Sequence, residues 1–206
     1  MDDNFFTISA PASIEIKEKG SRFIGETALA ETIEAAQQAL LAIRKREHGA
    51  THHCYAYSVR TANGLQFKYS DDGEPGGTAG RPIYDVVEGS GLVNLLCVVT
   101  RYYGGTKLGT GGLARAYSNA AKQAIEQSGR KEEFTMSSYL LEFAFPAYDQ
   151  VNRLLLVSGA KTVESDFGEA VRLQIQIRES KAEALVEQLT ELTAGQARIT
   201  EVDRAE

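Results

Sequence analysis

The hydrophobic positions of the chain repeat with two periods, and each period predicts one type of secondary structure. Apolar and polar residues alternate over 12–30, which predicts two strands around the turn Lys19-Gly20-Ser21. A helical period follows over 31–46, where one face collects Ile33, Ala36, Leu40 and Ile43. The first part of the chain therefore begins with a hairpin and a helix.

Strands, loops and helices continue up to Gly129. Strands over 54–60 and 65–69 flank Ala62-Asn63-Gly64, which is a hairpin signal. The next segment, DDGEPGGTAG from Asp71 to Gly80, is too rich in glycine for regular structure. We then expect a short helix over 81–88, a strand over 92–103, a Gly-rich loop and a helix over 112–128. The strand over 92–103 is so apolar that it is expected at the centre of a sheet.

The pattern restarts after the charged run Arg130 to Glu133, which we interpret as a linker. The expected elements are strands over 135–145, 161–167, 170–178 and 196–202 and helices over 146–158 and 180–193. Their order, βαββαβ, is that of a ferredoxin-like split unit. We therefore predict an α+β chain of two domains, 1–132 and 133–206.

Charge and cysteine content limit the class of protein. The net charge is -6, and it is divided into -1 over residues 1–133 and -5 over residues 134–206. A nucleic-acid site would therefore have to be a local basic patch. The two cysteines form no C-x-x-C pair, the start Met1 to Asn4 has no apolar segment behind it, and the apolar run Leu92 to Val99 is short. We expect a cytoplasmic protein with no signal peptide and no membrane span.

The first candidate for chemistry is Thr51-His52-His53-Cys54 at the start of a strand. Alternation places His52 and Cys54 on one face and His53 on the other. A zinc site would need a second ligand pair, and a Cys–His nucleophile would need a third orienting group. Both remain alternatives, but we favour histidines that fix a strand beside a site, with no metal.

The second candidate is the acidic segment that begins at Asp71. Three carboxylates stand close together at Asp71, Asp72 and Glu74, and Arg81 follows. The run does not have the ligand spacing of an EF-hand. We expect a mobile, acidic surface loop, although its glycines would also allow the backbone to close over a ligand.

The third candidate is the run from Arg101 to Arg115, in which a strand, a Gly-rich loop and a helix start follow one another. Free N–H groups and the helix dipole make this order suitable for an anion. The alternative is tight packing without a ligand. The run lacks the Gly-Lys-Ser/Thr order of a P-loop. Gly109-x-Gly111-x-x-Ala114 matches a dinucleotide fingerprint literally, but five loop residues separate it from the strand and no βαβ unit with a suitable acidic residue follows. The predicted phosphate- or RNA-binding residues are Arg81, Arg101, Tyr102, Tyr103, Gly104, Gly105, Lys107, Gly109, Gly111, Gly112 and Arg115.

Three motifs together resemble one known family. THHCYAY, SDDGEPGGTAGRP and VVTRYYGGTKLGTGGLARAY, in this order and spacing, resemble the bacterial, YigZ-like branch of the IMPACT family over residues 18–130. The resemblance implies a first domain like domain 2 of ribosomal protein S5 and a second like domain V of elongation factor G. It implies no established catalysis. Eukaryotic relatives bind a ribosome-associated kinase activator through an additional N-terminal domain, so that partner is not carried over.

These observations lead to one main hypothesis and two alternatives. We expect a non-enzymatic binding protein without a cofactor, linked to translation, that meets RNA, the ribosome or a ribosome-associated protein through its Gly-rich basic face. The first alternative is a small-molecule or phosphate-ester enzyme that uses His52, Cys54 and the segment from Asp71 to Arg81. The second is a pure protein-interaction domain, which would be marked by an exposed apolar patch.

Overall fold

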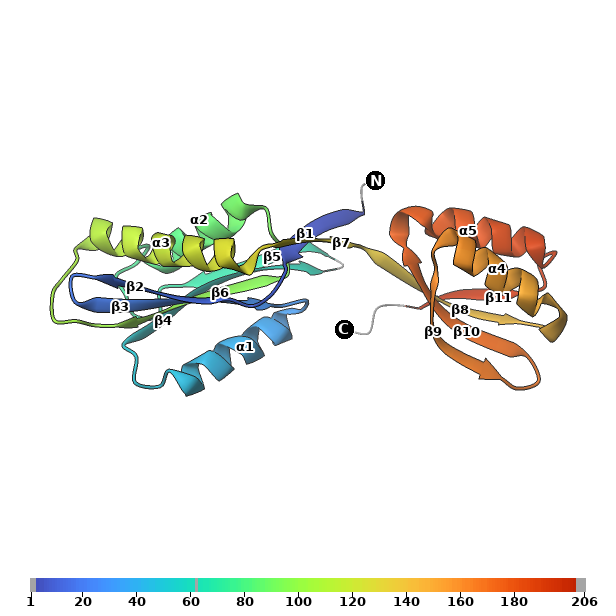
Figure 1. The fold of residues 1–206 in the computed structure, drawn as a ribbon, viewed down its shortest axis with the longest axis horizontal. Coiled ribbons are helices and arrows are strands. Elements are labelled where there is room, and N and C mark those ends of the chain that lie inside the picture. The colour runs from blue at the N-terminus through green and yellow to red at the C-terminus, as the bar shows by residue number, and fades with distance from the viewer. Residues whose placement is uncertain (1–2, 62, 203–206) are drawn as a thin grey trace. The chain divides into compact units, whose positions relative to one another are not determined.

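The structure is a computed structural model that describes residues 3–61 and 63–202. Met1 and Asp2 of the acidic start and Ala62 of the expected hairpin turn lie outside the described residues. The chain divides into two compact units (Figure 1). One unit is Phe6–Glu132. The other combines two segments, the first residues of the chain up to Phe5 and the chain from Glu133 onward. Helices and antiparallel sheets occur together, which confirms the mixed α+β class.

The N-terminal unit is built on a five-stranded antiparallel sheet in the order β2-β3-β6-β4-β5. Its strands are β2 (Ser13–Glu18), β3 (Ser21–Leu29), β4 (His52–Thr61), β5 (Gly64–Ser70) and β6 (Leu95–Tyr102). β6 is central and buried on both faces, as its apolar sequence predicts. It begins at Leu95 rather than at residue 92 because Asn94 adopts a left-handed φ of 55°, which a strand does not allow.

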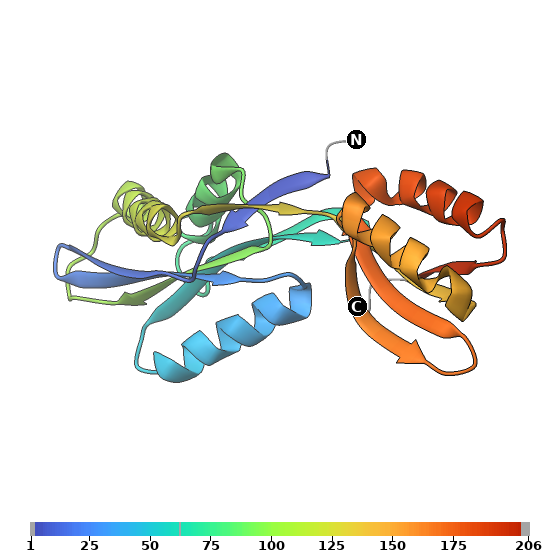
Figure 2. The same cartoon turned by 45° about the vertical axis from the view of Figure 1, so that its right-hand side comes forward.

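Helices cover both faces of this sheet. α1 (Ile33–Arg46) lies on one face, while α2 (Gly80–Ser90) and α3 (Thr110–Ser128) lie side by side on the other (Figures 1 and 2). A hydrophobic core lies on each face of the sheet, and successive residues of β6 point into opposite cores. Leu96 packs with α1, and Cys97 packs with α2 and α3. The sheet is therefore the middle layer of three.

Two glycines allow backbone to approach backbone in this unit. A Cβ on Gly25 of β3 would lie 2.5 Å from the carbonyl oxygen of Ala120, so α3 rests directly on the strand. A Cβ on Gly104 would lie 1.9 Å from the carbonyl carbon of Gly20 at the tip of the β2–β3 hairpin. The loop after β6 is therefore held against that hairpin.

The second unit contains one four-stranded antiparallel sheet in the order β11-β8-β10-β9. Its elements are β8 (Met136–Phe143), η1 (Phe145–Ala147), α4 (Tyr148–Ser158), β9 (Lys161–Phe167), β10 (Val171–Arg178), α5 (Glu179–Leu192) and β11 (Arg198–Val202). The strands and α-helices follow one another as βαββαβ, in agreement with the sequence pattern. Val151 and Leu185 of the helices pack against Leu173 and Ile175 of the sheet.

The charged run after Gly129 is a strand and not the expected linker. β7 (Arg130–Phe134) pairs with β1 (Asn4–Ile8), a strand that the sequence pattern did not predict. The Arg130 guanidinium lies 3.6 Å from the centre of the Phe6 ring. The first three residues of β7 are exposed, and an exposed strand tolerates charged residues, which explains why this sequence resembles a linker. In the described ranges, no helix combines the length and apolar character needed to cross a membrane.

Candidate functional site

The acidic segment after β5 is tied to the protein by its own carboxylates. Asp71 accepts hydrogen bonds from the backbone N–H groups of Gly77, Ala79 and Gly80 at 2.9, 2.9 and 2.8 Å. The Thr78 hydroxyl donates to the carbonyl of Pro75 at 2.7 Å. Satisfied backbone groups hold a loop in one conformation. The expectation of a loose acidic surface loop is therefore wrong, because these polar groups are already engaged.

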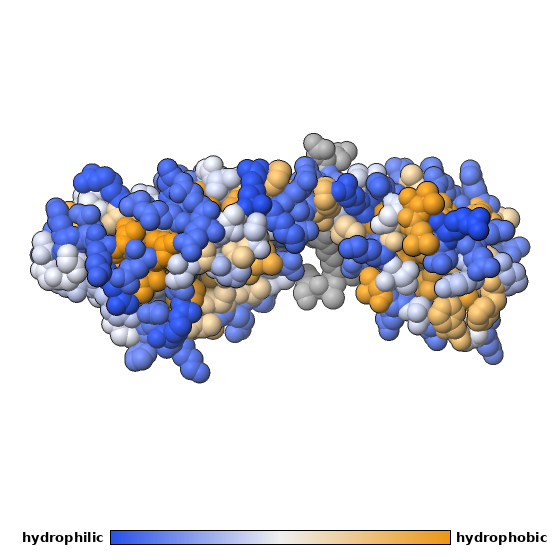
Figure 3. All heavy atoms as spheres, viewed as in Figure 1, coloured by the Kyte–Doolittle hydropathy of each residue, from blue (hydrophilic) through white to orange (hydrophobic). Residues whose placement is uncertain are grey.

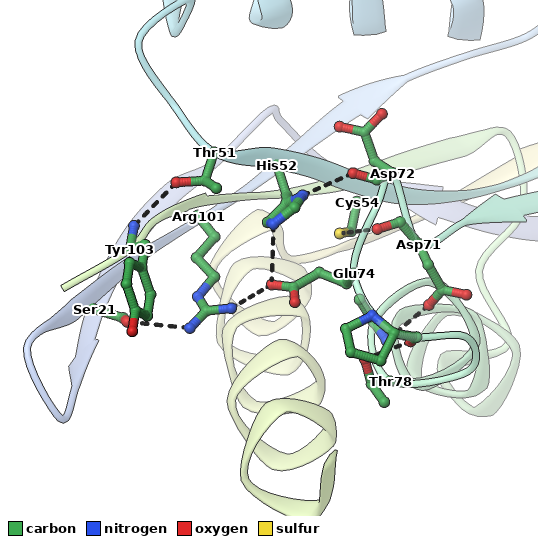
Figure 4. A network of polar contacts seen from close by, with 12 residues as sticks. Ser21, Thr51, His52, Cys54, Asp71, Asp72, Glu74, Thr78, Arg101 and Tyr103 are labelled. Carbon is green, nitrogen blue, oxygen red and sulfur yellow. Dashed lines mark hydrogen bonds and ion pairs between the residues drawn. The ribbon is translucent and has the colours of Figure 1, made fainter. Parts of the chain in front are cut away.

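Glu74 points inward and forms a buried ion pair with Arg101 of β6 (Figure 4). One Arg101 guanidinium nitrogen donates to Glu74 Oε1 at 2.5 Å, and the Tyr117 hydroxyl donates to the same oxygen at 2.8 Å. Another guanidinium nitrogen donates to Ser21 Oγ at 3.3 Å. Arg101 is only 5% exposed. Contrary to the sequence-based expectation, its charge is neutralised inside the unit and does not face an RNA phosphate.

The two histidines lie on opposite faces of β4, as the alternation predicts. His52 Nδ1 is 2.8 Å from the carbonyl of Asp72, and His53 Nε2 is 3.2 Å from the carbonyl of Glu47. Because a carbonyl can only accept, each of these nitrogens carries a proton. The other nitrogen of His52 lies 3.9 Å from Glu74 Oε1. Within residues 3–61 and 63–202, no three His, Cys, Asp or Glu side chains are placed to hold a metal ion.

The thiols are buried and protonated. Burial raises the pKa of Cys54 to about 12, and its Sγ donates to the carbonyl of Asp71 at 3.0 Å. Burial also raises the pKa of Cys97 to about 12. Burial, followed by the neighbouring Cys54, raises the pKa of Tyr117 far above its usual range. Because the thiolate is the nucleophile, this environment does not suit a Cys–His nucleophile.

The other face of β4 carries a second set of paired charges. Asp72 accepts from the His53 backbone N–H at 2.7 Å and from Arg44 at 2.6 Å. The Tyr102 hydroxyl donates to Glu47 at 2.8 Å and is the largest cause that lowers the pKa of Glu47. Sequence reasoning missed Arg44 and Glu47, because only the tertiary fold brings the end of α1 beside Asp72 and Tyr102.

The Gly-rich loop after β6 differs from this network because its groups are exposed. Residues 103–107 are all exposed, and so are Gly109, Gly111 and Arg115. α3 begins after Gly109, which supplies no side-chain cap, and its first turn contains no acidic residue. The positive end of the helix dipole therefore has no acidic side chain of that turn to offset it.

A groove of about 530 Å³ runs beside α3. It is lined by Ile16, Glu18, Lys19, Val86, Leu108, Gly112, Arg115, Ala116, Ser118, Asn119 and Lys122. Figure 3 shows an apolar patch in the region of α3 and β2, bordered by hydrophilic residues. No salt bridge among the described residues involves Lys19, Lys107 or Arg115. The groove and the loop together place Lys19, Lys107 and Arg115 around apolar side chains. Glu18 also lines the groove, and Lys122 lies 3.8 Å from Glu126.

The predicted site residues other than Tyr102, which hydrogen-bonds Glu47, fall into three places. His52, Cys54, Asp71, Asp72 and Glu74 come together with Arg101 in the network of Figure 4. The residues from Tyr103 to Arg115 form the exposed loop and the helix start. Arg81 lies on α2, where it pairs with Asp85 at 2.6 Å and contacts the Tyr84 ring on the β5 side of the sheet. The structure therefore does not bring Arg81 into the Gly-rich loop.

Known proteins match both units. The Impact N-terminal domain matches residues 19–125, and a domain of unknown function, DUF1949, matches residues 141–196. The IMPACT family member YigZ of Escherichia coli (strain K12) is 32% identical over 95% of this chain and 96% of that protein. The IMPACT family member YvyE of Bacillus subtilis (strain 168) is 34% identical over 96% of this chain and 91% of that protein.

A solved structure covers the complete chain as well. The crystal structure of a hypothetical protein superposes with a TM-score of 0.74 at 30% sequence identity, and the match covers 100% of both chains. This chain therefore belongs to the IMPACT family, as the order of its motifs, the two matched domains and the relatives that match over nearly their whole length all show.

Proposed function

We propose that this chain is a non-enzymatic binding protein linked to translation, which binds RNA or the ribosome through the loop of residues 104–109 and the first turn of α3. One observation carries the proposal: an exposed glycine loop, whose Lys107 has no salt bridge to any described residue, leads into a helix whose N-terminus has no side-chain cap. Backbone N–H groups and the helix dipole both favour a phosphate there. The proposed ligand is therefore a phosphate backbone.

Cationic side chains support the same ligand. Lys107 lies in the loop, Arg115 lies one turn into α3, and Lys19 and Lys122 line the groove beside it. The Tyr103 side chain is 48% exposed and could stack on an unpaired base. Gly105, Gly109 and Gly111 are exposed and leave the backbone accessible, whereas the predicted Gly104 donates its N–H to Ser21 Oγ and Gly112 is half-buried. These residues replace the predicted set. The buried Arg101, the distant Arg81 and Tyr102, whose hydroxyl donates to Glu47, are removed, and Lys19 and Lys122 are added.

The folds of the two units fit this role. We infer that residues 1–132 form a domain like domain 2 of ribosomal protein S5 and that residues 133–206 form a ferredoxin-like domain. The βαββαβ element order and the antiparallel sheet order β11-β8-β10-β9 support the second assignment. Both folds occur in components of translation, which is consistent with a cytoplasmic protein, although fold alone does not define function.

The polar network around His52 is less suited to chemistry than its composition indicates. Its carboxylates bind backbone N–H groups, Arg101 and Tyr117, and its thiol is kept protonated by burial. A catalytic group needs a free acceptor or donor directed at a substrate. The network therefore supports the enzyme alternative less than it supports a structural role.

The proposal is tested by measuring the affinity for single-stranded RNA over a range of salt concentrations. Replacing Lys107 and Arg115 by alanine should weaken binding and flatten the salt dependence by about 1.4, since each lost phosphate contact on a single strand contributes roughly 0.7 to the slope. The matched control replaces Lys161 and Arg172 by alanine in the second unit and should leave both quantities unchanged.

Two results would contradict the proposal. Equal affinity and slope in the wild type and the double variant would leave the loop as a packing device. A saturable affinity for ATP or a sugar phosphate that disappears in the double variant would instead favour an enzyme.

A further inference from the structure

The edge strand β5 carries a row of exposed apolar side chains that the proposed RNA site does not use. Leu65, Phe67 and Tyr69 are 52%, 54% and 39% exposed. They share one face of the strand, since successive side chains alternate. The Phe67 ring stacks on Tyr84 of α2 at 4.7 Å between ring centres, and Tyr69 lies 5.6 Å from Tyr84. An exposed apolar cluster of this kind indicates a protein interface.

The backbone of β5 is also available along one side. β5 is the last strand in the order β2-β3-β6-β4-β5. Thr61 and Gly64 face each other where the hairpin closes, and the Thr61 hydroxyl donates to the Gly64 carbonyl. Antiparallel pairing alternates from there, so Gly64, Gln66 and Lys68 turn their backbone groups toward β4. The N–H and C=O groups of Leu65, Phe67 and Tyr69 therefore point to the open edge.

Edge strands in soluble proteins are usually protected by charge, and β5 has little such protection. Lys68 is its one charged residue in the sequence GLQFKYS. The opposite edge strand, β2, reads SIEIKE and carries Glu15, Lys17 and Glu18. The two edges of the second sheet, β9 and β11, also carry charges of both signs. Among the four edge strands of the two larger sheets, β5 is therefore the one best suited to pair with another strand.

The sequence of β5 is complementary to itself. In an antiparallel pair of two copies centred on Phe67, Phe67 faces Phe67, Leu65 faces Tyr69, and Lys68 faces Gln66. No like charges oppose each other, and each apolar side chain meets an apolar one. The same register pairs all the outward backbone groups of Leu65, Phe67 and Tyr69.

Local charge argues against RNA as the occupant of this surface. Arg81 beside Tyr84 is already paired with Asp85 at 2.6 Å, and the Tyr84 hydroxyl donates to Glu88 at 2.9 Å. Single strands of nucleic acid require a positively charged groove together with stacking rings. The positive and negative side chains around Tyr84 offset each other, so this surface is better suited to an uncharged apolar strand than to RNA.

We propose that β5 pairs antiparallel with β5 of a second copy of this chain, in the register centred on Phe67. The pairing joins two five-stranded sheets into one continuous sheet and covers the aromatic cluster of each copy. It is a two-fold contact, in which the same surface is used by both copies, and it therefore closes at a dimer.

Sedimentation of the full chain over a wide range of concentration tests the pairing. The wild type should form a dimer, and Phe67→Glu should raise the dimer dissociation constant at least about tenfold, because two carboxylates then face each other on an apolar surface. Phe145→Glu is the matched control, since Phe145 is 49% exposed in the second unit. Circular dichroism establishes that each variant is folded.

Cysteine cross-linking tests the register independently. In the proposed pairing, residue 67 faces itself at a Cα separation of about 5.5 Å, which a disulfide can span. Phe67→Cys should therefore form a covalent dimer under mild oxidation by copper phenanthroline much faster than Gln66→Cys. The native Cys54 and Cys97 are buried and should not interfere. A monomeric wild type, a dimer unaffected by Phe67→Glu, or equal cross-linking at both positions would overturn the proposal.

Discussion

Replacing Glu74 by glutamine should destabilise the protein by about 3–5 kcal/mol, because the change leaves a buried arginine without its counter-charge. The side chains of Glu74 and Arg101 are 4% and 6% exposed, so water cannot take over the role of the carboxylate. Glutamine keeps the shape of the side chain and an oxygen that can accept from Tyr117. The loss therefore reports mainly on the charge of Arg101.

This loss is large beside the total stability of a domain, which is typically about 5–15 kcal/mol. A second change should reduce it. Arg101→Met removes the unpaired charge, and apolar replacements of buried ion pairs are often close to neutral. The variant that carries both Glu74→Gln and Arg101→Met should consequently be more stable than Glu74→Gln alone.

Urea unfolding followed by circular dichroism measures these differences. Arg81→Met is the matched control, since the Arg81–Asp85 pair is 55% and 54% exposed and should contribute no more than about 0.5 kcal/mol. A Glu74→Gln variant whose free energy of unfolding falls by less than about 1 kcal/mol would refute the reasoning, because a loss that small is what an exposed ion pair gives. Full additivity of the two single changes would refute it as well.

Three further predictions concern packing, pH and thiol reactivity. Gly104→Ala should lower the free energy of unfolding in urea by about 1–3 kcal/mol, because the new Cβ would meet the Gly20 backbone. Gly76→Ala is the control, since a Cβ there has open space and should change stability by less than about 1 kcal/mol; equal effects would contradict the close approach of Gly104 to Gly20. The Tyr102 hydrogen bond lowers the pKa of Glu47 below its ordinary value of 4.5, so the stabilisation from Glu47 is present above pH 4.5 and is lost as the pH falls through the pKa of the folded state. Tyr102→Phe should therefore lessen the loss of stability on acidification, and an unchanged pH profile would argue against the hydrogen bond. Cys54 and Cys97 should react with a thiol reagent at pH 8 only as fast as the protein unfolds, and rapid labelling of the folded chain would contradict their pKa of about 12.

Much of the fold could be predicted from local patterns. The alternation over β2 and β3, the apolar β6 and the amphipathic α5 each follow from a repeat of period two or 3.6. The ribbon of β1 and β7 could not be predicted, because its strands lie at distant positions in the sequence and pair with each other. Non-local pairing of this kind leaves no periodic signal in a short charged strand.

The candidate site could be predicted in part. The exposed loop before α3 was identified because glycine followed by a helix start is a local signal. The burial of Arg101 was not, because only the tertiary fold brings Glu74 from a distant loop beneath β6. A sequence shows that an arginine and a glutamate are present, but the neutralisation of one by the other depends on long-range contacts.

An NMR titration of the ¹⁵N-labelled protein with single-stranded RNA tests the central claim most directly. If the loop holds a phosphate backbone, the amide signals of Gly105, Gly109, Gly111 and Gly112 should shift together and saturably, and Lys107→Ala with Arg115→Ala should abolish the shifts. The amide signal of Gly73, which is exposed and lies beside His52, should not shift. Saturable shifts at Gly73 with an unperturbed loop, or no shifts at any RNA concentration, would contradict the account.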